Sequence, residues 1–283
     1  MAEARVTLPG DIVNSQASSM LQGRGTYVDN GVLRASFLGT FKQVNQLGYV
    51  EPLHGKYFAQ VGDVVVGVVQ RIGGNCWYID IGSSMKVQLS ILQVNTEELA
   101  TRRKLDEDVY EMRNLFDIGH VISCEVQRVS PNGTVMLQTR TSKYGRLDNG
   151  ILVKIKPNLM LRQSKHMHEL PSGISMILGC NGFIWLAPLS NQGDAATRSQ
   201  VYHDICTFRR IILCLAGAGI QINYSLLCET FDFFKQTCVG KNSLTKEEAP
   251  QLLERFLSEK RAREDQLLTA SELSQTNSSG NTL

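Results

Sequence analysis

Five runs of β-branched and aromatic residues, separated by glycine-containing turns, constrain the fold of this chain more than any other feature. Runs of this kind predict strands. Three follow closely on one another and two more come after a charged insertion: Val61–Val69, Cys76–Gly82, Val87–Ile91, Val121–Val129 and Val135–Gln138. Five strands of this length are the number found in an OB barrel. We therefore predict a five-stranded OB barrel over residues 59–142.

The charged insertion between the third and fourth runs, residues 96–116, contains neither glycine nor proline. Its apolar residues recur among dense charge, and Thr96 is followed by two glutamates in what would be the first turn. This pattern predicts a capped, amphipathic helix. The basic triplet Arg102-Arg103-Lys104 would then lie on the solvated face of that helix.

The segments on either side of the predicted barrel have different patterns of apolar residues and glycines. Residues 1–58 consist of short apolar runs broken by glycine, which predicts small antiparallel strands in an all-β unit. Residues 143–240 contain strand-like runs around a glycine loop, followed by amphipathic helices at 200–216 and 224–236, so we predict an α+β unit. Within residues 241–283 we expect a last helix at 247–268 and a flexible polar tail from residue 269. The predicted fold class is therefore mainly β plus α+β.

Several classes of site are not indicated by the sequence. The seven cysteines include no Cys-x-x-Cys pair, and the histidines lack ligand-like spacing, so we predict no metal site, no disulfide framework and no cofactor. The apolar stretch 211–218 is far shorter than the roughly 18 residues needed to cross a bilayer. No apolar segment with a cleavage site follows Met1, so we also predict no secretory signal. The expected compartment is the cytosol or the nucleus.

Positive charge is concentrated where the barrel leads into the α+β unit, although the chain as a whole has a net charge of only +2. A single acid, Asp148, lies among seven cations: Arg140, Lys143, Arg146, Lys154, Lys156, Arg162 and Lys165. Such a stretch suits a phosphate backbone. It is equally typical of a solvated surface, and charge alone leaves both interpretations open.

Specific segments also carry a resemblance to a known family. Val61–Val69, together with Trp77–Gly82 and Asn132–Leu137, resembles an S1-type RNA-binding domain, and the unit after it resembles a KH domain. The preceding glycine-rich β unit and the Gly-x-Asn-Gly sequence within Leu178–Trp185 complete a domain order similar to that of the S1/KH cap subunits of the RNA exosome. The resemblance covers roughly residues 5–235.

The resemblance implies an RNA-binding face on the barrel. Typical S1 domains place two aromatics, a histidine and an arginine there, whereas this chain has Gln88 at the histidine position and Thr134 at the arginine position. Neighbouring strand residues point to opposite faces, so only one of Trp77 and Tyr78 can face outward, and we favour Tyr78. The candidate RNA-binding residues are Tyr78, Trp77, Lys86, Arg71, Arg128, Arg140, Lys143 and Arg146.

The glycine loop departs from the pattern of a KH domain that binds RNA. A working loop carries a basic residue between its glycines to clamp the sugar-phosphate chain, but Gly179-Cys180-Asn181-Gly182 contains no cation. We interpret it as a structural, interface-facing loop in which Asn181 suits a tight turn or a left-handed backbone and bonds locally.

The resemblance implies a non-catalytic subunit that sits with other S1-containing caps on a ring of RNase PH-like subunits. It would stabilise the ring through residues 1–58 and guide single-stranded RNA into the pore for 3′-to-5′ degradation and rRNA processing, in the nucleus, the nucleolus and the cytoplasm. The alternative is an autonomous S1/KH protein, such as a translation or regulatory factor. The loss of the usual binding side chains at Gln88, Thr134 and the cation-free loop Gly179–Gly182 would leave a lone binder weak. This favours the subunit, because partners that share a pore add contacts through effective concentration. An enzyme is the third hypothesis, since the acids around Asp106 suit a solvated helix better than a metal site.

Overall fold

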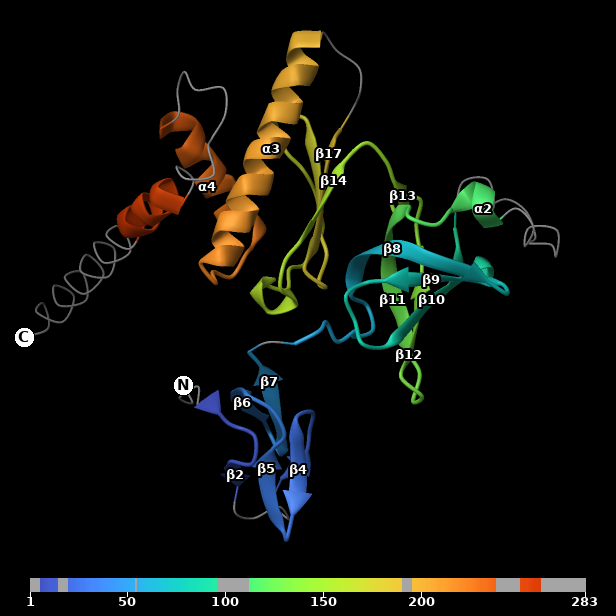
Figure 1. Cartoon of the computed structure of the whole chain (residues 1–283), viewed down its shortest axis with the longest axis vertical. Coiled ribbons are helices and arrows are strands. Elements are labelled where there is room, and N and C mark those ends of the chain that lie inside the picture. Colours follow the sequence, from blue (N-terminus) through green and yellow to red (C-terminus); the bar gives the residue numbers. More distant parts are fainter. Residues whose placement is uncertain are drawn as a thin grey trace, which may run out of the picture.

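The computed structural model describes residues 6–14, 20–53, 55–95, 112–189, 195–237 and 250–260. Three folded units follow one another along the chain (Figure 1). A small β unit, drawn in blue, stands apart from the other two and is joined to them through the segment around residue 55. A barrel comes next, and a sheet with helices along one side completes the described chain.

The N-terminal unit consists of two small sheets, ordered β1-β6-β7-β3 and β2-β5-β4. The unit is all-β as predicted, and its pairings are antiparallel as expected except that of β3 with β7, which is parallel. Asn30 and Gly31, both with positive φ, form the tight turn between β4 and β5. The strands are β1 (Val6–Thr7), β2 (Ile12–Asn14), β3 (Leu21–Gln22), β4 (Thr26–Asp29), β5 (Val32–Ala35), β6 (Gly39–Val44) and β7 (Leu47–Pro52).

The second unit is a closed barrel in which the five predicted strands all form. Strand β12 pairs with β10 in parallel and with β11 antiparallel, which closes the sheet on itself. Alternate residues such as Val65, Trp77 and Leu89 fill the interior. The strands are β8 (Val64–Gly73), β9 (Cys76–Asp80), β10 (Lys86–Ser90), β11 (Val121–Val129) and β12 (Thr134–Gln138).

The barrel takes in residues beyond the expected range 59–142. Tyr57 is buried among the barrel's core residues, and its backbone amide donates to the carbonyl of Gly82. After β12, strand β13 (Gly145–Leu147) extends the sheet by pairing with β11. Of the predicted helical insertion, the structure describes α2 (Met112–Leu115), whereas residues 96–111, including the basic triplet, lie outside the described residues.

The third unit is a four-stranded sheet, ordered β14-β17-β16-β15, covered on one face by helices (Figure 1). The predicted helices form slightly longer than expected, and residues 250–260, within the predicted last helix, are helical. The tail from residue 269 lies outside the described residues. The elements are β14 (Ile151–Lys154), β15 (Met167–Glu169), β16 (Ile174–Leu178), β17 (Phe183–Pro188), α3 (Ala195–Gly217) and α4 (Tyr224–Thr237).

The opposite face of this sheet packs against the barrel. Val66 of β8 shares a small buried core with Ile177, Phe183 and Trp185 of the hairpin β16–β17. An ion pair also joins the two units: Asp63 is 5% exposed, and its carboxylate accepts hydrogen bonds from the Tyr57 hydroxyl at 2.5 Å and the Arg162 guanidinium at 2.9 Å. A buried carboxylate requires such partners. The barrel and the α+β unit therefore form one packed body.

Replacing Tyr57 by Phe should lower the free energy of unfolding by about 1.5 to 3 kcal/mol, because it removes a hydrogen bond to a charged, buried group. Burial and the bond to Asp63 raise the pKa of Tyr57, so its hydroxyl is a protonated donor at ordinary pH. Urea unfolding of the full chain measures the loss, with Tyr27→Phe as the control because Tyr27 is 39% exposed. Equal stability of the two variants would contradict a role for this bond.

Candidate nucleic-acid interface

The two adjacent aromatics of β9 point in opposite directions. Trp77 is 0% exposed, packs edge-on against Phe116 and donates from Nε1 to the Phe116 carbonyl at 2.9 Å. Tyr78 lies on the outer surface of the barrel and is partly exposed. The alternation of strand residues thus separates the pair as expected. Trp77 belongs to the barrel core and not to a binding surface, which corrects its place among the candidate residues.

Two cations lie against the outward-facing ring of Tyr78. The guanidinium carbon of Arg71 is 4.2 Å from the ring centroid, and Nζ of Lys86 is 5.1 Å from it. Arg71 stands opposite Tyr78 because a shift of register between Val69 and Arg71 adds a residue to β8 there. Such bulges re-aim side chains. The contacts are cation–π interactions, which hold the charges beside the aromatic surface.

A row of side chains continues this surface across the barrel. In the strand register, Tyr78 faces Gln88, Gln88 faces Met136, and Met136 faces Arg128. Nε2 of Gln88 is 2.9 Å from the sulfur of Met136. Gln88, at the position where the family's typical histidine is expected, therefore lies on the same surface as Tyr78. We call this surface the barrel face and define it by Arg71, Tyr78, Lys86, Gln88, Arg128 and Met136.

The chemistry of the barrel face suits a single-stranded phosphate chain. Its exposed cations can contact phosphates, and both the Tyr78 ring and the Arg71 guanidinium plane can stack on bases. The acid at the end of β9, Asp80, has its carboxylate 3.8 Å from Nζ of Lys154. Cations and stacking planes of this kind recognise nucleic acid with little preference for sequence.

The other predicted cations do not gather into one patch. Arg146 is on β13, which is separated from β9 in the sheet by β8 and β11, and its side chain bonds to Asp148 at 2.8 Å. Arg140 and Lys143 are exposed in the segment between β12 and β13. Arg162 binds the buried Asp63. The basic stretch is thus divided between exposed charges and charges held in ion pairs.

The Gly-x-Asn-Gly sequence forms the turn of the hairpin β16–β17 and is inserted against the barrel. The Asn181 side chain, 1% exposed, donates through Nδ2 to the carbonyls of Val66 at 2.7 Å and Ile81 at 2.9 Å. The expectation of local bonds was wrong, because these partners lie on the barrel. The left-handed residue is Gly182, with φ +79°, whose missing side chain leaves space for the Ile155 carbonyl.

Three backbone amides of this turn also donate hydrogen bonds within the protein. Cys180 donates to the carbonyl of Val64 at 2.9 Å, Gly179 to that of Phe183 and Gly182 to that of Gly179, each at 3.0 Å. Burial raises the pKa of Cys180 to about 11, so its thiol is protonated at neutral pH. The turn has no cation, and three of its backbone amides are engaged, so it lacks the groups with which a KH loop clamps a phosphate.

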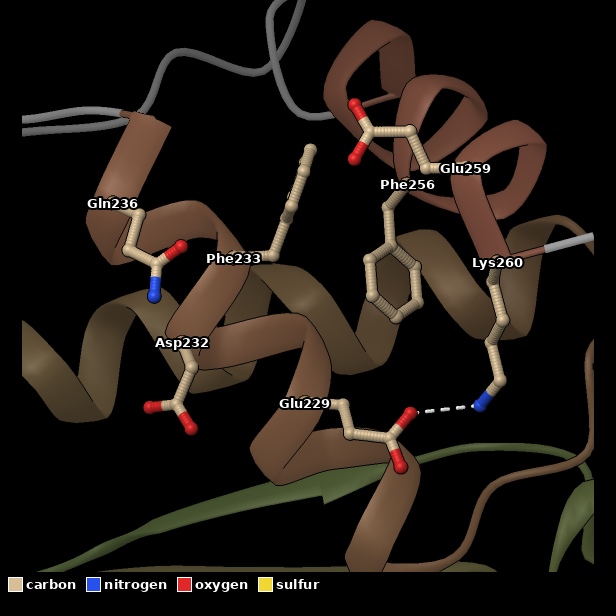
Figure 2. A pocket seen from close by; sticks show the side chains of 7 residues that line it. All are labelled: Glu229, Asp232, Phe233, Gln236, Phe256, Glu259 and Lys260. Atoms are coloured by element: carbon tan, nitrogen blue, oxygen red, sulfur yellow. Dashed lines mark hydrogen bonds and ion pairs between the residues drawn. The ribbon is translucent and has the colours of Figure 1, made fainter. Parts of the chain in front are cut away.

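A separate hollow of about 280 Å³ lies between α4 and the helix at residues 250–260. Figure 2 shows the side chains of Phe233 and Phe256 projecting from the two helices, and Glu229 bonded to Lys260. In the part of the chain that the structure describes, no three His, Cys, Asp or Glu side chains gather so that they could hold a metal ion. Of the described helices, none is long and apolar enough to cross a membrane.

Family models match three stretches of the chain. The model described as the RRP4 S1 domain matches residues 56–128, a KH domain matches residues 150–192, and the exosome complex exonuclease RRP4 N-terminal region matches residues 6–44. The first stretch covers the barrel from β8 to nearly the end of β11 but stops before β12. The second contains the β strands of the α+β unit, and the third contains most of the N-terminal unit.

Similar curated proteins come from distant organisms. Exosome complex component RRP4 of Mus musculus is 38% identical over 68% of this chain and 66% of its own length, and the Caenorhabditis elegans homologue is 38% identical over 66% and 61%. The Arabidopsis thaliana homologue is 34% identical over 81% of this chain and 78% of its own length. The chain thus spans less than two thirds of the mouse and nematode relatives and more than two thirds of the plant one.

Proposed function

The chain belongs to the family of exosome complex component RRP4, and from this membership we propose that it is an RNA-binding, non-catalytic cap subunit of an RNA exosome. The observation that carries the proposal is the barrel face, where Arg71 and Lys86 lie against the outward ring of Tyr78. Because the chain aligns with only part of its mouse and nematode relatives, its partners and substrates belong to this proposal.

In the proposed mechanism the barrel face holds a single RNA strand by its phosphates and bases. Arg71, Lys86 and Arg128 neutralise phosphates, while bases stack on Tyr78 and on the Arg71 guanidinium. The strand passes on to a nuclease elsewhere in the assembly, which shortens it from the 3′ end during RNA degradation and rRNA processing. The chain itself breaks no bond and needs neither metal nor cofactor. Arg140, Lys143 and Arg146 are a secondary part of the proposed RNA path.

The proposed partners are the RNase PH-like ring and the other S1-containing caps, in the nucleus, including the nucleolus, and in the cytoplasm. Residues 1–58 would dock on the ring, residues 59–142 would bind RNA, residues 143–240 would support the barrel, and residues 241–283 would form a helix and tail. The matched stretches support this division, since each falls largely within one of the first three units.

The turn Gly179–Gly182 is, in this proposal, a structural element that orients the barrel. Its support is the pair of hydrogen bonds from buried Asn181 to Val66 of β8 and to Ile81, which directly follows β9. Fixing the barrel against the α+β unit would fix the direction of the barrel face relative to the other caps, which a shared RNA path requires.

Replacing Arg71 and Lys86 together by glutamine should weaken RNA binding and make it less dependent on salt. Each phosphate contact to a single strand contributes about 0.7 to the slope of log affinity against log salt, so losing two should reduce the slope by about 1.4. The measurement is fluorescence anisotropy with single-stranded RNA over a salt series, on the full chain. Arg198→Gln with Arg209→Gln on α3 is the matched control. An equal loss of RNA affinity and of salt dependence in both double variants would contradict a role of the barrel face in RNA binding.

A further inference from the structure

A pocket of about 460 Å³ lies at the outer edge of the α+β sheet, where β15 meets the start of α4. It is distinct from the barrel face and from the turn Gly179–Gly182. Pockets of a few hundred cubic ångströms are the size that small ligands occupy. The lining residues are Gln163, Ser164, Lys165, Met167, His168, Glu169 and Tyr224.

A parallel pair of rings forms one wall of this pocket. The rings of His168 and Tyr224 are stacked, with centroids 4.0 Å apart and an angle of 9° between their planes. Nε2 of His168 lies 3.1 Å from the Lys165 carbonyl, to which it can donate. Burial lowers the pKa of His168, which favours an uncharged ring near neutral pH. The pair therefore presents a flat, neutral aromatic surface.

The backbone holds both rings in place. His168 belongs to β15 and faces Met176 of β16 in the sheet. Tyr224 is the first residue of α4, directly after Asn223, whose side-chain oxygen accepts the Leu226 amide at 2.7 Å and caps the helix. Just before it, Ile222 exchanges backbone hydrogen bonds with the segment Leu159–Leu161. The stack is thus preformed by two elements that are far apart in sequence.

The pocket also contains a polar group that lacks a partner. Nε2 of Gln163 is buried, and within the described part of the chain it has no hydrogen-bond acceptor. A buried donor of this kind calls for an explanation, and an acceptor supplied by a ligand would satisfy it. Lys165 is exposed and offers a positive charge, and Glu169 is exposed and offers an acceptor. The pocket therefore combines a stacking plane, an amide donor, a cation and a carboxylate.

We propose that this pocket binds one nucleotide of single-stranded RNA, with the base stacked on the His168–Tyr224 pair. In this arrangement Gln163 donates to a base carbonyl, Lys165 contacts a phosphate and Glu169 accepts from a ribose hydroxyl. These are the groups by which proteins recognise unpaired RNA bases. The inference goes beyond the proposed function, because it adds a second RNA contact that does not depend on the barrel face.

A protein strand added to the edge of β15 that no described strand pairs with is the competing occupant. Such a strand is held mainly by main-chain hydrogen bonds and makes no use of a stacked ring pair or of the buried Gln163 amide. The side chains therefore favour RNA, and the experiment below separates the two occupants.

The test is photocrosslinking of the full chain to oligouridylate that carries thiouridine, followed by mass spectrometry of the adducts. We expect adducts on the peptide that contains His168 or on the one that contains Tyr224. Tyr224→Ala should reduce them about five-fold or more, because stacking on one aromatic is worth at least that factor. Tyr224→Phe, which keeps the ring, should retain them. Lys165→Gln changes an exposed side chain and should leave the fold intact, and it should reduce the adducts and their dependence on salt.

The double variant Arg71→Gln with Lys86→Gln separates this inference from the proposed function. Pocket adducts should persist in that variant, and their disappearance would show that the pocket does not bind RNA by itself. Adducts confined to the barrel in the unmodified chain, or equal adducts in Tyr224→Ala and Tyr224→Phe, would overturn the inference. Protein crosslinks to β15 in the assembled complex, without RNA adducts there, would assign the edge to a protein strand instead.

Discussion

Replacing Leu21 and Val44 together by aspartate is expected to abolish incorporation of the chain into a multi-subunit complex. Both side chains belong to a row on the N-terminal unit, because Leu47 pairs with Leu21 on one side and with Val44 on the other. Leu21 is 62% exposed, Val44 is 55% exposed and Leu47 is 40% exposed. Directly paired residues share a face of the sheet, so the row is one exposed apolar patch. Two unpaired charges buried in an interface there would strongly oppose docking.

The measurement is the amount of ring protein that co-purifies with the tagged full chain. Ile118→Asp with Leu213→Asp is the matched control, because these apolar residues are similarly exposed, at 54% and 41%, but lie outside the N-terminal unit. Removal of residues 1–53 should have the same effect as the double aspartate variant. That truncation keeps Tyr57, which the barrel core needs, so the remainder should fold by circular dichroism. Full occupancy of the ring by either altered chain would contradict the docking proposal.

Replacing Asn181 by aspartate should be the most destabilising of the substitutions considered, at about 3 to 5 kcal/mol, because it buries an uncompensated charge. The aspartate has the same size, but an oxygen would face the carbonyls of Val66 and Ile81 in place of the amide that now donates to both. Asn181→Ala, which leaves the two carbonyls without this donor, should cost on the order of 3 kcal/mol. We also expect the barrel and the α+β unit to unfold in one transition in the unmodified chain and in two separate transitions in the variant.

Urea unfolding followed by tryptophan fluorescence can report this loss, because Trp77 lies in the barrel and Trp185 in the α+β unit. Asn114→Ala is the control, since Asn114 is exposed on α2. If Asn181→Asp unfolds with the stability and cooperativity of the control, the turn does not hold the two units together.

The sequence predicts the barrel well because its strands are long, rich in β-branched residues and separated by glycine turns. It predicts β15 less well, since Met167–Glu169 is a three-residue strand whose form depends on pairing with β16. Tyr57, at the boundary between the N-terminal unit and the barrel, is equally hard to place from the sequence. Nothing in its local sequence shows that it packs into the barrel, because the residues that surround it come from distant strands. Long-range pairing decides both cases, and local pattern carries little information about it.

The candidate site shows where residue pattern is sufficient and where it is not. Strand alternation predicts that Tyr78 and Trp77 face opposite ways, but the register shift that brings Arg71 to Tyr78 has no local signature. The partners of Asn181 lie at least 100 residues away along the chain. The sequence does not single out His168 and Tyr224 as site residues, because their stacked pair forms only when α4 packs against the sheet that contains β15.

Affinity purification of the intact, tagged chain with quantification of its partners tests the central proposal most directly. As a cap subunit, the chain should recover RNase PH-like proteins and the other S1-containing caps in amounts comparable to its own, and the recovery should survive treatment with ribonuclease because the contacts are between proteins. Recovery of the folded chain with RNA but without any ring protein would contradict the proposal and would favour an autonomous S1/KH RNA-binding protein.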